Sequence, residues 1–418
     1  VDGMKEFHGN ITLPDGSLRP VDGFKSSAIT AEAGSNSEGR TGDVTISVNQ
    51  GMKLTNGAKI SVSNLAVVAD PSQLNGLPED QKPNLTIRTG SLAIDTRASI
   101  MASTSGNVDA SAIKITSAGD LSLGQDAIIN GSTSSAGKGA SIALKAATLM
   151  LDGQGSISSI SSESMPAPSP SATETTGNAG NVDISASRLI LSNGGQIKTS
   201  TLTAGQAGVA TIAADNILVD GANNTQVLTG IASTTRGTGD SGHISVTATK
   251  DFSLVRLGQI NASTDAAGKA GSIDIHAGSV LVDGKLDTKN HISASAISAE
   301  AGPASSGKTG DITINARRNI TLSRGGKLSA QNYANVSPEA ATRLNAQRPR
   351  LTVNAPDITL IDSQISTAST GNVNASNIDI RFSNKLHLDP SSITTSANSG
   401  DGGAIDIRGG RLMVLDNS

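Results

Sequence analysis

The chain has 418 residues, a formal net charge of −4, no Cys, no Trp and only one Tyr and four Phe. This composition argues against a thick aromatic core, excludes disulfide and thiolate chemistry, and offers no dense run of Lys or Arg to bind nucleic acid. No apolar run approaches the ~20 residues of a membrane-spanning helix, so we expect none. The 46 Gly, with abundant Ser, Thr, Asn, Ile and Val, favour short strands and turns.

A short alternating apolar patch recurs twelve times along the chain. The interval from Ile87 to Ile115 is the same as that from Ile184 to Ile212, whereas other intervals are longer, which indicates one basic unit that insertions sometimes lengthen. A second patch follows each first one, as at 149–151, and a third patch carries one large aliphatic residue. The second apolar residues of the twelve first patches are Ile46, Ile87, Ile115, Leu144, Ile184, Ile212, Val246, Ile275, Ile314, Val353, Ile380 and Ile407.

Three short strands per unit predict an all-β fold, a right-handed parallel β-helix (solenoid) of about twelve three-strand coils. A hairpin sandwich would need longer strands that pair antiparallel. We expect a partial coil over residues 1–38 and one continuous β-helix shaft over 39–418. Small residues two positions after the first anchor, such as Ala146 and Ala214, should lie at a corner of the coil. Paired glycines before the first strand should adopt positive φ, namely Gly39 and Gly42, Gly177 and Gly180, Gly268 and Gly271, Gly307 and Gly310.

A longer period overlies the coils. Residues 27–46 return at 295–314 with 14 of 20 positions identical. We therefore predict that the coils at about 28–133 are duplicated at about 296–398.

Insertions between the patches are candidates for recognition loops or for tolerated surface elaborations. Those at 64–83, 161–176 and 332–349 leave between the third and first strands, so they should project along one edge, and a helix is expected within 338–346. Two smaller ones, at 222–230 and 285–296, should leave along another edge.

The pattern G-x-x-G-x-I-x-I-x-A, then L-x-L, then a turn and I-x-A-S-T, resembles the repetitive shaft of filamentous haemagglutinin-type exoproteins, which Gram-negative bacteria export by two-partner secretion. The resemblance covers about residues 28–416. It implies a large secreted adhesin or surface filament, located outside the cell or on the bacterial cell surface. The Asn-Pro-Asn-Gly type motif of the secretion domain is absent, so we expect a fragment whose export signal lies upstream of Val1.

Two functions remain open from the sequence. One is a non-catalytic structural or adhesive shaft that mediates surface attachment or matrix and filament assembly, with a host-surface, glycan or matrix receptor left unspecified. The alternative is an extracellular β-helix enzyme that binds or cleaves polysaccharide. Its best acidic pair is Asp379 and Asp406, but Arg381 and Arg408 stand two residues further on and should neutralise it. We favour the shaft and assign no catalytic, cofactor-binding or metal-binding residues and no cofactor.

Alternation along the second strand also predicts an outward apolar column, interrupted by Ser253 and Thr321. Such a column is a candidate lateral contact between shafts, while open coil ends would favour end-to-end association. The proposed contact residues are Met150, Ile190, Leu218, Leu281 and Met413.

Overall fold

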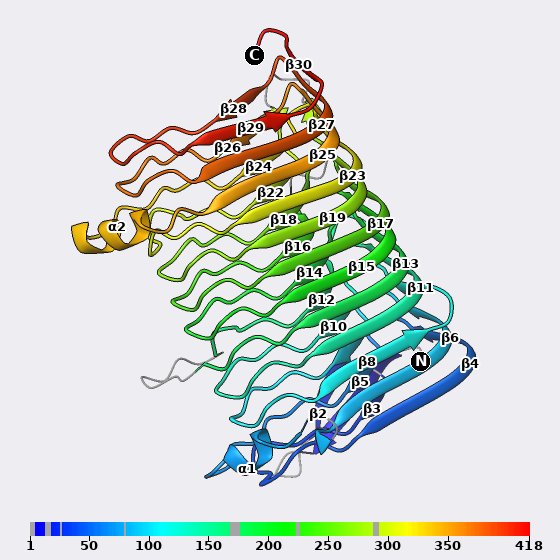
Figure 1. Ribbon diagram of the computed structural model, residues 1–418. Helices are drawn as coiled ribbons and strands as arrows, with labels where there is room; N and C mark the ends of the chain where they lie inside the picture. Colours follow the sequence, from blue (N-terminus) through cyan, green and yellow to red (C-terminus); the bar gives the residue numbers. More distant parts are fainter. Residues whose placement is uncertain are drawn as a thin grey trace.

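The computed structural model describes residues 5–12, 18–25, 27–78, 81–167, 176–222, 226–286 and 292–418. It is a parallel β-helix, which confirms the predicted fold class, and its coils stack in sequence order along one axis (Figure 1). Within residues 1–38, β1 (Lys5–Thr12) and β2 (Leu18–Lys25) form an antiparallel pair, and β3 (Ala28–Thr30) begins the coils.

One wall of the helix is a sheet of twelve short parallel strands, which we call the short sheet. It corresponds to the predicted third strands. Its members in chain order are β3, β5 (Lys59–Ser61), β7 (Ser99–Met101), β10 (Ile128–Asn130), β12 (Ser158–Ser161), β14 (Gly195–Lys198), β16 (Thr229–Ala232), β18 (Gly258–Asn261), β22 (Ala296–Ser298), β24 (Lys327–Ser329), β26 (Gln364–Ser366) and β28 (Ser392–Thr394).

The other wall, the long sheet, unites the predicted first and second strands. In most coils the two patches form one continuous strand, whereas β8 and β9 stay separate. Its members are β4 (Val44–Leu54), β6 (Asn84–Ile94), β8 (Ala112–Ser117), β9 (Leu121–Leu123), β11 (Ile142–Asp152), β13 (Val182–Ser192), β15 (Ala210–Asp220), β17 (Ile244–Val255), β19 (Ile273–Asp283), β23 (Ile312–Ser323), β25 (Arg350–Ile361), β27 (Asn377–Asp389), β29 (Ile405–Gly409) and β30 (Leu412–Leu415).

A corner inside each long strand explains why the sequence shows two patches. In the pairings of β15, β17 and β19 with the next strand, the register shifts directly after Ala214, Ala248 and Ala277, which are predicted corner positions. These three alanines are themselves buried. Ala146 pairs with Ala186 without such a shift. Alanine holds this position in the neighbouring coils, although Phe382 takes it in β27.

The core consists of aliphatic columns that run the length of the rod. Each inward residue pairs in register with a similar residue one coil away, as Ile129 does with Ile100 and Ile160, and all three are fully buried. Burying one such side chain contributes roughly 1.5–3 kcal/mol. The thin core is therefore stabilised by repetition along the axis, since strands stack only ~4.8 Å apart.

A buried polar column, which the sequence did not predict, closes the third side of the helix. One residue per coil forms single parallel bridges from Ala33 through Thr235 to Ala397. In most coils where that residue carries a hydroxyl, the hydroxyl donates to the carbonyl four residues further on, as from Thr235 to Gly239 at 2.6 Å. The same bond is made by Thr104, Thr133, Thr201, Thr264 and Ser369. Ser164, which precedes an insertion, donates to the Gly177 carbonyl instead.

The paired glycines are needed for a different reason from the one predicted. Of the eight, only Gly307 has a positive φ, at 81°. A Cβ on Gly310 would lie 1.6 Å from the carbonyl oxygen of Gly271, and one on Gly271 would lie 1.8 Å from that of Gly242. The prediction of positive φ was therefore wrong for the other seven. At Gly271 and Gly310, glycine is required because any side chain would collide with the backbone of the preceding coil.

The insertions carry the two helices. The first holds α1 (Ser72–Asn75) and the third holds α2 (Pro338–Asn345), which confirms the helix expected within 338–346. Both helices lie on the same long edge of the rod, as predicted, one near each end (Figure 1). The second insertion includes 168–175, which lie outside the described residues. The 285–296 insertion forms the antiparallel pair β20 (Lys285–Leu286) and β21 (Ile292–Ser293).

The first and third insertions are held by the same hydrogen bonds. The Asn107 side chain bonds both the N–H and the carbonyl of Val68, at 2.9 and 2.7 Å. The Asn372 side chain makes the same two bonds to Val336, at 2.9 and 2.7 Å. Identical anchoring in both regions agrees with the proposed duplication.

Candidate functional site

The outward apolar column lies where the alternation placed most of it. Met150, Ile190 and Leu218 pair in consecutive coils, and Leu281 follows beyond Ser253. Met150 is 39% exposed, whereas the other three apolar members are partly buried. The structure thus brings together four of the five predicted contact residues.

Met413 does not belong to this column. It pairs with Leu386, a fully buried inward residue, and Val414 pairs with the outward His387. The assignment of Met413 was therefore wrong by one residue. The cause is one additional residue at the corner: Met413 lies four residues after Gly409, as Leu386 does after Phe382, whereas Leu149 lies three residues after Ala146.

The acidic pair of the enzyme alternative is neutralised within its own strands. Asp379 and Asp406 are neighbours in adjacent strands. Arg381 donates two hydrogen bonds to Asp379, at 3.1 and 3.0 Å, and Arg408 lies 2.8 Å from Asp406. Hydrogen bonding from Arg381 outweighs burial and holds the pKa of Asp379 below its usual value. Each acid is thus paired with the arginine two residues further on.

Two of the histidines make local contacts. His243 Nδ1 lies 2.7 Å from the Ser272 hydroxyl, and its Nε2 lies 3.6 Å from Asp274. His387 Nε2 lies 3.0 Å from Asp416. Within the described ranges, no three residues of the types His, Cys, Asp and Glu are grouped closely enough to hold a metal ion.

A groove of about 910 Å³ lies on the outer face of the short sheet and crosses from β12 to β22. No motif in the sequence indicated this groove. Its floor is made by two outward columns, one on each side of the buried Ile column. The first contains Gln196, Gly230 and Gln259 in consecutive coils, and the second contains Lys198, Ala232 and Asn261.

The middle of the floor is low because β16 carries small residues where its neighbours carry long ones. Gly230 replaces the Gln of both adjacent coils, and Ala232 stands between Lys198 and Asn261. A Cβ on Gly230 would lie 1.9 Å from the carbonyl oxygen of Gln259. The depression is therefore built into the backbone.

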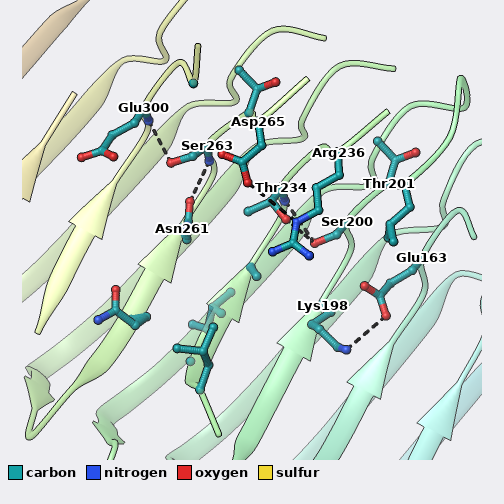
Figure 2. A pocket seen from close by; sticks show the side chains of 18 of the residues that line it. Glu163, Lys198, Ser200, Thr201, Thr234, Arg236, Asn261, Ser263, Asp265 and Glu300 are labelled. Atoms are coloured by element: carbon teal, nitrogen blue, oxygen red, sulfur yellow. Dashed lines mark hydrogen bonds and ion pairs between the residues drawn. The ribbon is translucent and has the colours of Figure 1, made fainter. Parts of the chain in front are cut away.

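Along one side of the floor, hydroxyl groups lie between two carboxylates (Figure 2). Glu163 pairs with Lys198 at 3.3 Å at one end, and Glu300 pairs with Lys327 at 3.6 Å at the other. Between them come three hydroxyl residues, one per coil: Ser200, Thr234 and Ser263. The Glu residues are four strand spacings apart, roughly 19 Å at ~4.8 Å per spacing.

The hydroxyl and amide groups are fixed by backbone contacts. The Ser200 hydroxyl oxygen accepts from Thr234 N at 3.1 Å, and that of Ser263 accepts from Glu300 N at 2.9 Å. The side-chain carbonyl oxygen of Asn261 accepts from Ser263 N at 2.8 Å. The Thr234 hydroxyl donates to Ser200 at 3.2 Å, and Ser200 is itself buried. The partly exposed Asn261 and Ser263 each keep a donor group for the groove.

Apolar side chains form the two rims. Leu228, 70% exposed, stands on one rim, where Gln196 Nε2 donates to its carbonyl at 2.7 Å. On the other rim are Leu202, 36% exposed, and Tyr333, the sole tyrosine of the sequence. Burial, and then the charge of Glu300, raise the pKa of Tyr333, and its hydroxyl donates to the side-chain carbonyl of Gln331.

The groove carries no surplus positive charge. Its charged lining residues are two basic and three acidic ones, and two ion pairs join four of these five. Arg236 and Asp265, both about 70% exposed, lie 3.7 Å apart on the rim. A bound molecule would therefore meet mainly neutral hydroxyl and amide groups.

No described helix is both long and apolar enough to cross a membrane. Comparison of the chain with models of protein families, with curated proteins and with solved structures gives no match.

Proposed function

We propose that this chain is a segment of the non-catalytic shaft of a large secreted or cell-surface bacterial filament or adhesin, and that it serves surface attachment or matrix and filament assembly. One observation carries the proposal: the coil-to-coil register of the aliphatic column of the short sheet continues from β3 to β28 without a break. A uniform rod transmits position and force along its axis, which suits a spacer better than a catalyst.

The repeated insertions support the same function. The Asn107 and Asn372 clamps occur at equivalent places in two blocks of coils. Duplicated blocks extend a rod without altering its cross-section. The resemblance of the coil pattern to filamentous haemagglutinin-type shafts agrees with this.

The polysaccharide-cleaving alternative is less well supported by the geometry of the carboxylates. Glycosidases of the common two-carboxylate type place the two acids about 5 to 10 Å apart across the scissile bond. Glu163 and Glu300 in the groove are roughly 19 Å apart by strand count. Asp379 and Asp406 are close together, but Arg381 and Arg408 occupy their oxygens.

Labelling of intact cells tests the proposed location. An antibody raised against this chain should stain unpermeabilised cells of the source bacterium or its secreted fraction, with a cytoplasmic enzyme as the negative control. Staining only after permeabilisation would refute the proposal.

In parallel, incubation with neutral and anionic polysaccharides should release neither reducing ends nor unsaturated products. Turnover that is abolished by changing Asp379 and Asp406 together would favour the enzyme.

A further inference from the structure

We propose that the groove across β12 to β22 binds a neutral, linear oligosaccharide. This inference deepens the proposed adhesive function, on which its biological meaning rests, by naming the chemical class of the ligand.

The polar groups of the groove suit the hydroxyls of a sugar chain. Ser200, Thr234 and Ser263 repeat once per coil. The Thr234 hydroxyl donates to Ser200 at 3.2 Å and so offers a ligand an acceptor, whereas the Ser263 hydroxyl, which accepts from Glu300 N, can donate to one. Because Asn261 uses its carbonyl oxygen on Ser263 N, its amide NH₂ is left as a donor. Regularly spaced donors and acceptors match a polymer whose hydroxyls also recur regularly.

The rims supply apolar surface for the carbon-bound faces of sugar rings. Tyr333 is partly exposed and lies at the Glu300 end of the groove. Aromatic side chains offer both a flat apolar face and a polar edge. Leu202 and Leu228 expose apolar surface on opposite rims. A ring lying above the small floor residues Gly230 and Ala232 would contact both polar and apolar walls.

Other ligand classes fit less well. A peptide cannot extend the sheet here, because β14, β16 and β18 are each hydrogen-bonded to neighbours on both sides. An anionic polymer would need a basic groove, yet Lys198 is paired with Glu163 and Arg236 with Asp265. An amphipathic helix would need a continuous apolar floor, whereas half of the floor residues named above are amides.

Binding can be measured by titration calorimetry with cellohexaose, maltohexaose and chitohexaose, and with a heparin hexasaccharide as the anionic probe. We expect a Kd between about 10 μM and 1 mM for at least one neutral hexamer and weaker binding of the heparin fragment. Failure of all three neutral hexamers, or tighter binding of heparin, would overturn the proposal.

Two pairs of variants place the site. Ala232→Gln should weaken binding at least tenfold because it fills the depression, and the fold should tolerate it because Lys198 and Asn261 occupy the same column. Thr394→Gln, in the equivalent position of β28, is the matched control and should bind like wild type. Tyr333→Ala should lose several-fold in affinity, whereas Tyr333→Phe keeps the ring and should lose little.

An unchanged affinity in Ala232→Gln, with the wild-type circular dichroism spectrum and melting temperature, would remove the groove from consideration. These measurements use the purified chain, so they are independent of its location in the cell. Absence of sugar binding would leave the shaft proposal standing, and absence of surface labelling would leave the measured sugar site standing.

Discussion

Thr235→Val tests whether the buried hydroxyl column stabilises the coil. Thr235 is fully buried, donates to the Gly239 carbonyl at 2.6 Å and accepts from Gly237 N at 3.2 Å. Valine keeps the size and shape of the side chain but makes neither bond. A buried polar group without its partner costs about 1–3 kcal/mol, so we expect the free energy of opening this coil to fall by about that amount.

Amide hydrogen exchange is the suitable assay, because long repeat arrays need not unfold in one cooperative step. A loss of about 1–3 kcal/mol corresponds to about 5- to 150-fold faster exchange of the amides in β16 and β18. Amides of β5, at the far end of the rod, serve as an internal reference and should keep their rates.

Thr235→Ser is the matched control, because Ser164 and Ser369 occupy the same column naturally. It loses one methyl group, worth roughly 1 kcal/mol, but keeps the hydroxyl. We expect it to exchange more slowly than the valine variant. Equal rates in Thr235→Val and wild type, or faster exchange in Thr235→Ser than in Thr235→Val, would refute the reasoning.

Three further predictions address the coil spacing, an ion pair and lateral association. Gly242→Ala places a Cβ 1.9 Å from the carbonyl oxygen of Gly208, so it should lower the melting temperature markedly; an unchanged melting temperature would contradict close coil contact. Burial would raise the pKa of Asp283, but hydrogen bonds from Arg324 and Ser323 outweigh burial and lower the pKa. The ionised Asp283 therefore stabilises the fold at neutral pH, and this stabilisation is lost as the pH falls through the folded-state pKa, below about pH 4. Asp283→Asn should therefore melt earlier than wild type at pH 7 and by a smaller margin at pH 3, and a gap independent of pH would argue against the pair. Sedimentation velocity should show less concentration-dependent association when three members of the outward column become Asn, namely Met150, Ile190 and Leu218. Unchanged sedimentation of that variant would remove the column as a contact surface.

Local pattern alone predicted the coil and its inward columns. Alternation around anchors such as Ile184 specifies which side chains face inward, because a strand exposes opposite faces at successive residues. The small residue at Ala214 marked the corner, and Pro338 with the following residues marked α2. These features depend on neighbours in sequence, so the sequence was sufficient to predict them.

Contacts between coils required the tertiary structure. Gly271 lies against the backbone of Gly242, and the groove exists because Gly230 and Ala232 stand between longer residues of adjacent coils. Coils differ in length because insertions interrupt some of them and not others, so the residue that lies next to a given position depends on where each insertion is accommodated. Met413 was misplaced for the same reason: one residue of register reverses the face, and only the pairing of β30 with β27 fixes that register.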